Sequence, residues 1–177
     1  MPRIPYRTDD QAGTGELVNS IRKRRGGTLL NLDRLLLYSP PFARGWNALL
    51  GAVRNELSLA PKLRELAMCG VAILNGADYE FIHHAPEFVK AGGSEAQVEA
   101  LRGFGADGFD AALFGGIEGA TLALTAEMTR GVSVDDGTFA ALRAHLPDAQ
   151  IVELVGVIAA YNMVSRFLVA LGVEPEA

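Results

Sequence analysis

The sequence predicts an all-α protein, a helical bundle of about eight helices. Apolar residues recur at helical spacing in most segments, no segment alternates in the manner of a strand, and glycine or proline residues separate the segments. The 177 residues suit one domain with a full-sized core. We expect a single domain over residues 1–177, in which residues 1–14 form an extended N-terminal arm.

The first half of the chain predicts three helices after this arm. One runs from about residue 15 to 25, and its basic residues 22–25 are best explained as cations that complement a helix C-terminus rather than as an anion site. A short helix with Leu32, Leu35 and Leu36 follows, and Asn31 is its expected cap. The third begins at Ser39-Pro40-Pro41 and carries Trp46 on its apolar face.

Two central helices meet at Asn75-Gly76, a sequence typical of a helix end. Pro61 suits the first position of a helix, and the residues up to position 74 are apolar nearly all round, as in a buried helix. In the second helix, His84 shares one face with Phe81 and Phe88. We expect Pro86 to kink or interrupt this helix.

The second half predicts a short helix from Ser94, then a glycine-rich loop at 103–109. This loop lacks the GxxxxGK[ST] pattern of a phosphate cradle. Helices are expected at about 110–130, with a bend or close packing at Gly115-Gly116, then from 133 to 145 and from 148 to 171. The apolar run at 151–173 is interrupted by Glu153, Asn162, Ser165 and Arg166, which favours a buried core helix over a membrane span.

Composition excludes several classes of function. The net charge of −5 argues against binding to nucleic acid or to an anionic membrane. Charged residues make up 21% of the chain, below the usual share, which indicates burial in a homo-oligomer. The one cysteine, Cys69, permits no intrachain disulfide. The N-terminus has no apolar signal region, so we expect a cytoplasmic protein.

The central pair gathers titratable groups beside apolar ones. Glu65 lies in the first helix, and Tyr79, Glu80, His83 and His84 lie in the first two turns of the second. Glu80 and His84 are four residues apart, so their side chains can meet. We expect Glu65, Glu80 and His84 to share one buried pocket.

The stretch RELAMCGVAILNGADYEFIHHAPEFVKAG resembles the carboxymuconolactone decarboxylase family, part of the alkylhydroperoxidase-D-like superfamily. The resemblance extends from about residue 29 to 173 and is weaker between 103 and 119. It implies an alkylhydroperoxidase-D-like helical bundle and a trimer or hexamer. The peroxidase branch uses a CxxC dithiol, whose positions are Ala77 and Glu80 here, so the resemblance excludes a dithiol peroxidase mechanism.

The decarboxylase branch implies cofactor-free acid–base chemistry on a small carboxylated lactone or a related intermediate of aromatic catabolism. Glu65, Glu80 and His84 are the expected catalytic residues, since a positioned acid must protonate carbon after CO2 is lost. We expect Tyr79, His83 and Trp46 to contact the substrate.

Three alternatives remain open. The same three side chains form a buried triad that only joins two helices, in a binding or assembly subunit. A second alternative is a peroxidase that works by another route. Glu80-x-x-His83 has the spacing of a di-iron ligand pair, but the chain lacks a second such pair, so we expect no metal and no cofactor.

Overall fold

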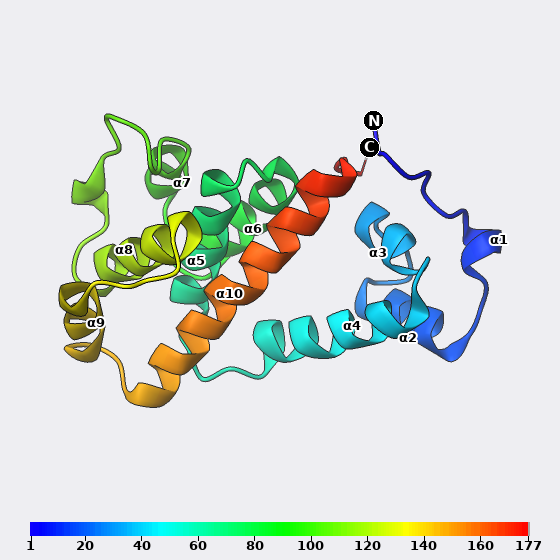
Figure 1. The fold of residues 1–177 in the computed structure, drawn as a ribbon, viewed down its shortest axis with the longest axis horizontal. Helices are drawn as coiled ribbons and strands as arrows, with labels where there is room; N and C mark the ends of the chain where they lie inside the picture. The colour runs from blue at the N-terminus through cyan, green and yellow to red at the C-terminus, as the bar shows by residue number, and fades with distance from the viewer. Residues whose placement is uncertain (177) are drawn as a thin grey trace. The chain divides into compact units, whose positions relative to one another are not determined.

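The computed structural model describes residues 1–176, and these residues form α-helices and one 3-10 turn, with no strand. The predicted all-α class is confirmed. Eight of the helices have seven or more residues, in agreement with the expected number. The chain divides into two compact units, Met1–Glu56 together with the segment from Leu168 onward, and Leu57–Phe167 (Figure 1). Each unit is described separately below, and the prediction of one domain stays a prediction.

The first unit holds four helices from the N-terminal part of the chain. They are α1 (Asp9–Ala12), α2 (Glu16–Arg24), α3 (Asn31–Leu36) and α4 (Pro40–Asn55). Helices α2 and α3 each pack against α4. Their small apolar core consists of Val18, Ile21, Leu29 and Leu37.

The predicted extended arm contains one helical turn, which corrects the sequence-based boundary. Helix α1 forms because Thr8 and Gln11 make a reciprocal capping box, each side chain accepting from the other's backbone N–H. Such a local motif stabilises a turn without apolar periodicity, so the search for a period missed it.

The expected cap of α3 is also corrected. Asn31 is the first helical residue, and Leu30 occupies the N-cap. The buried Asp33 carboxylate accepts from the Leu30 N–H at 3.1 Å and from Arg25 Nε at 3.1 Å. Arg25, from the basic segment, therefore neutralises a buried acid, a role that the dipole interpretation did not foresee.

The second unit is built around α5 (Pro61–Leu74). This helix packs against α6 (Asp78–Lys90), α7 (Glu95–Leu101) and α8 (Ile117–Arg130). The 3-10 turn η1 (Ala111–Leu113), α9 (Asp136–Arg143) and α10 (Asp148–Leu171) complete it. Figure 1 shows α5 and α6 in green, with α8 and α10 alongside. The shared core includes Leu66, Cys69, Phe81, Phe88, Leu101 and Leu122.

Two further boundaries differ from the expectation. Helix α6 continues through Pro86 to Lys90, because the backbone bond that proline cannot donate would reach Ile82, a solvent-exposed residue whose carbonyl water can satisfy. The predicted helix at 110–130 is shorter than expected. Gly116 has φ of 54°, so the chain turns there and α8 begins at Ile117.

Helix α10 is the one helix within residues 1–176 that is long and apolar enough to cross a membrane, and half of its apolar window is buried inside the protein. Its polar residues are used internally. The Glu153 carboxylate accepts from the backbone N–H groups of Ser58 and Leu59 at 3.1 and 2.7 Å. Asn162 accepts from the Asn75 side chain at 3.1 Å. Helix α10 thereby fixes both ends of α5.

Candidate functional site

The hairpin of α5 and α6 positions the titratable residues. Asn75 closes α5, and Gly76 with φ of 62° reverses the chain, a conformation that favours glycine. The two helices then run antiparallel and pack on each other. Glu65 in the second turn of α5 is thereby brought opposite His84 in the second turn of α6.

Glu65, His84 and Glu80 form a continuous buried cluster. The His84 Nδ1–H donates to Glu65 Oε2 across 2.6 Å. On the other side of the ring, His84 Nε2 lies 3.1 Å from Glu80 Oε2, as the i, i+4 spacing allows. All three side chains are less than a tenth exposed. One imidazole therefore lies between two carboxylates inside an otherwise apolar helix pair.

Tyr161 of α10 is a fourth member of this cluster. Its hydroxyl oxygen is 3.1 Å from His84 Nε2, and the two rings meet edge to face at 5.0 Å. Tyr161 is fully buried. When His84 is neutral with its proton on Nδ1, the Tyr161 O–H can donate to Nε2. When His84 is an imidazolium, Nε2–H faces both the Glu80 carboxylate and the Tyr161 oxygen.

The cluster favours an ionised pair at neutral pH. Burial alone would lower the pKa of His84, but its hydrogen bonds to Glu65 and Glu80, and their charges, raise the pKa above its usual 6.5. Burial would likewise raise the pKa of Glu65, yet the His84 hydrogen bond and charge, helped by Arg64, lower the pKa below 4.5. Arg64 Nε lies 3.3 Å from Glu65 Oε1. His84 is thus held as an imidazolium.

Cys69 lies one helical turn beyond Glu65 and is fully buried. Burial raises the pKa of its thiol far above the usual range, and the negative charges of Glu65 and Glu80 raise it further. A reactive cysteine needs the opposite surroundings, which are accessible and electropositive. The Cys69 side chain accordingly packs as part of the apolar core of the second unit.

Tyr79 and His83 form a separate pair on a neighbouring stripe of α6. Their rings stack with centroids 4.4 Å apart, and His83 Nδ1 lies 2.7 Å from the Tyr79 carbonyl oxygen. Tyr79 is buried, whereas His83 is half-buried. The partly accessible His83 ring is the member of this pair that a ligand could reach.

Trp46 belongs to the first unit. It lies on α4, is buried, and meets the Phe42 ring edge-on at 5.7 Å. The prediction that it contacts a substrate stays a prediction.

The di-iron spacing at Glu80 and His83 does not build a metal centre in the described residues. No group of three or more histidine, cysteine, aspartate or glutamate side chains within 1–176 is arranged to hold a metal ion. The Glu80 carboxylate lies beside His84, and the His83 ring lies over Tyr79.

The sequence placed Glu65, Glu80 and His84 on two adjacent helices but did not single out Tyr161 or Arg64. A signal for Tyr161 exists, because its hydroxyl lies on a stripe of α10 otherwise formed by Val157, Ile158 and Val164. A buried tyrosine hydroxyl generally has a hydrogen-bond partner. The sequence could have flagged the residue, but not named its partner 77 positions away.

Comparison with known proteins gives one family. Residues 40–115 match the model of the carboxymuconolactone decarboxylase family, and this range contains both helices of the site. A search among curated protein sequences gave no match.

Several solved structures share the fold over nearly the whole chain. An uncharacterized peroxidase-related protein from Ralstonia eutropha JMP134, described as an alkylhydroperoxidase AhpD core, has a TM-score of 0.82 at 18% identity, over 99% of this chain and 92% of that one. A peroxidase-related protein from Silicibacter sp. TM1040 has a TM-score of 0.74 at 20% identity, over 99% and 94%. The debrominase Bmp8, in complex with 2,3,4-tribromopyrrole, has a TM-score of 0.73 at 18% identity, over 97% and 90%. The predicted alkylhydroperoxidase-D-like fold is therefore confirmed.

Proposed function

Since residues 40–115 place the chain in the carboxymuconolactone decarboxylase family, we propose that it is an enzyme that protonates carbon in a small carboxylated ring compound through Glu65, His84 and Glu80. The observation that carries this proposal is the His84 imidazole held between two buried carboxylates, at 2.6 Å and 3.1 Å.

A structural ion pair would need only one of these carboxylates. Burying charges is costly, and a buried pair is often no more stable than an apolar replacement. Retaining a second carboxylate at the opposite nitrogen of the same ring supports a role in moving a proton. Glu65 holds the ring and its charge from the Nδ1 side, and the proton on Nε2 faces Glu80 and Tyr161.

In the proposed reaction, the bond between the ring carbon and the substrate carboxylate breaks. The electron pair enters the conjugated lactone carbonyl as a dienolate, CO2 departs, and a proton from the His84–Glu80 pair then adds to carbon. Each turnover therefore consumes one proton, which solvent returns to the pair. Proton transfer from a positioned acid contributes roughly 10²- to 10⁴-fold to a rate.

Tyr161 is proposed as a positioning residue in this step. After His84 gives up its Nε2 proton, the Tyr161 hydroxyl can donate to the neutral ring and keep its orientation. Tyr79, His83 and Trp46 are proposed to contact the substrate, and His83 is the most accessible residue of the stacked pair.

A thiol-based reaction is the less favoured alternative, although two structural neighbours are described as peroxidase-related. The chain has one cysteine, and burial raises the pKa of the Cys69 thiol. A debromination such as the name of the third neighbour denotes can be assayed beside decarboxylation with 2,3,4-tribromopyrrole as the test compound.

The proposal is tested by turnover of a carboxymuconolactone, followed as CO2 release. We expect activity in the wild type, loss of about 10²-fold or more in Glu80→Gln and His84→Ala, and unchanged activity in Cys69→Ser, the matched control from the same core. Circular dichroism and melting temperature establish that each variant is folded.

Two outcomes would overturn the proposal. The first is a folded protein that turns over no lactone and whose His84→Ala variant only melts at a lower temperature, which would make the cluster a helix-joining triad. The second is activity, on a peroxide or on the bromopyrrole, that Cys69→Ser abolishes, which would make the thiol the reactive group.

A further inference from the structure

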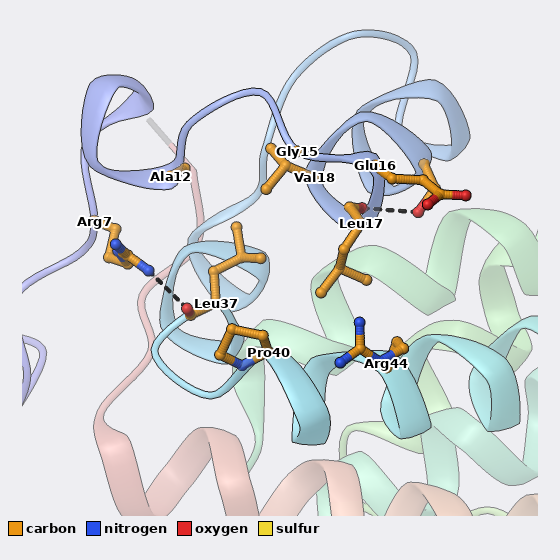
Figure 2. Close-up of a pocket in the computed structure, with 10 residues that line it drawn as sticks. Arg7, Ala12, Gly15, Glu16, Leu17, Val18, Leu37, Pro40 and Arg44 are labelled. Atoms are coloured by element: carbon orange, nitrogen blue, oxygen red, sulfur yellow. Dashed lines mark hydrogen bonds between the residues drawn. The ribbon is translucent and has the colours of Figure 1, made fainter.

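The first unit contains a cavity of about 540 Å³, which is in the range of small-ligand sites. Its walls come from the N-terminal arm, from the first turns of α2, and from the start of α4 (Figure 2). The apolar lining residues are Ala12, Leu17, Val18, Leu37 and Pro40. A cavity of this size and lining suits one compact apolar body.

The charged groups at this cavity are unequal. Arg7 and Arg44 line it, and Glu16 is the one acidic residue that does. Figure 2 shows the Glu16 side chain directed away from Arg44, on the outer side of the first turn of α2. The cavity therefore presents a net positive charge toward its interior.

The two arginines differ in what they already bind. Arg7 donates from Nη1 to the Leu37 carbonyl oxygen at 2.7 Å, and its guanidinium lies 5.5 Å from the centre of the Tyr38 ring. Arg44 has no hydrogen bond or ion pair with any residue among 1–176. In Figure 2 its guanidinium points from α4 toward Leu17 across the cavity. Its five donors are available to an anion.

We propose that this cavity binds a small monocarboxylic acid with an apolar body, with the carboxylate on Arg44 and the apolar part against Leu17, Leu37 and Pro40. A planar guanidinium matches a carboxylate with two parallel hydrogen bonds. The apolar walls add the burial energy that a free anion alone would lack. This site is separate in its chemistry from the proton transfer proposed at His84.

The experiment measures binding of octanoate, octanol and acetate to the intact protein by isothermal titration calorimetry. We expect octanoate to bind saturably at one site per chain, and both octanol and acetate to bind at least about tenfold more weakly, since the first lacks the charge and the second the apolar body.

Arg44→Gln tests the assignment, with Lys23→Gln as the matched control. Both residues are exposed, lie in the first unit and lose the same charge, but Lys23 does not line the cavity. We expect Arg44→Gln to weaken octanoate binding about tenfold or more and to leave octanol unchanged, and Lys23→Gln to leave both unchanged.

Three results would overturn the proposal. They are no saturable octanoate binding, equal affinity of octanoate for the wild type and Arg44→Gln, and equal loss in Arg44→Gln and Lys23→Gln. The last would mean that the anion responds to overall charge rather than to this cavity. Turnover of a lactone is not used in the measurement, so failure of the proposed enzymatic function leaves the result interpretable.

Discussion

Glu65 carries two tasks at the scale of single residues. It accepts a 2.6 Å hydrogen bond from His84, and it lies 3.3 Å from Arg64 at the edge of the cluster. A buried carboxylate without such partners would be neutral. With them, Glu65 stays charged and in turn keeps His84 charged.

The Glu65–His84 pair predicts a defined pH dependence of stability. The pKa of His84 is higher in the folded protein than its usual 6.5, so its contribution is complete below pH 6.5 and is lost as the pH rises through the folded value. The pKa of Glu65 is lower than its usual 4.5, so its contribution is complete above pH 4.5 and is lost as the pH falls through the folded value.

We therefore expect Glu65→Gln to lower the free energy of unfolding most between pH 4.5 and 6.5, by about 3 kcal/mol as for other broken buried pairs. Glu87→Gln is the control, since Glu87 forms an exposed pair with Lys90 and its loss should cost no more than about 0.5 kcal/mol. Denaturant unfolding at several pH values measures both. A destabilisation that is the same at every pH would contradict the paired charges.

What the sequence could predict at this scale depended on separation along the chain. Glu80 and His84 are four apart on one helix, and Glu65 precedes them across a short turn, so their meeting followed from helical geometry. Tyr161 meets His84 across 77 residues, and that contact depends on how α10 packs. The family resemblance supplied the expected roles, since spacing alone does not distinguish a proton relay from a joining triad.

At the scale of elements, the closest helix contact in the second unit is made by Gly70 of α5. A Cβ at this position would lie 3.1 Å from the Thr125 methyl group and 3.3 Å from the Phe104 ring. Gly70 therefore lets α5 approach α8 and fixes the helix that carries Glu65.

Gly70→Leu should destabilise the protein by about 1–3 kcal/mol or more, because the added side chain has no space. Gly51 of α4 offers the matched control, since a Cβ there meets no atom within 4 Å. Gly51→Leu should be neutral or stabilising by up to about 1 kcal/mol, from helix propensity alone. Thermal and denaturant unfolding compare them, and an equal effect of both would contradict the close approach at Gly70.

Helix boundaries show where local rules are limited. The buried character of α5 and its end at Asn75 followed from sequence. Pro86 did not end α6, because the hydrogen bond it lacks falls on the solvent side of the helix. Gly115-Gly116 did separate two segments, yet the glycine pair alone did not tell a bend from a complete break.

At the scale of the whole molecule, we propose a homo-oligomer, a trimer or hexamer as the family resemblance implies. Its physical motive is the low share of charged residues, together with exposed apolar side chains that include Ile82 and Val152. Light scattering at micromolar concentration should give three or six times the chain mass of 18.8 kDa. A mass of one chain would contradict this proposal.

The cytoplasmic location and a small-molecule substrate are proposals of the same standing. They follow from the net charge of −5 and from the acid–base cluster, respectively.

The central claim is that His84 is an imidazolium held between Glu65 and Glu80. Titration of the histidine ring nitrogens by nuclear magnetic resonance tests it most directly, with the His84 signals assigned by their loss in His84→Ala. We predict that His84 titrates above pH 6.5 in the wild type, and at lower pH in both Glu65→Gln and Glu80→Gln. A His84 that titrates at or below its usual value, or that is unchanged in both variants, would contradict the claim.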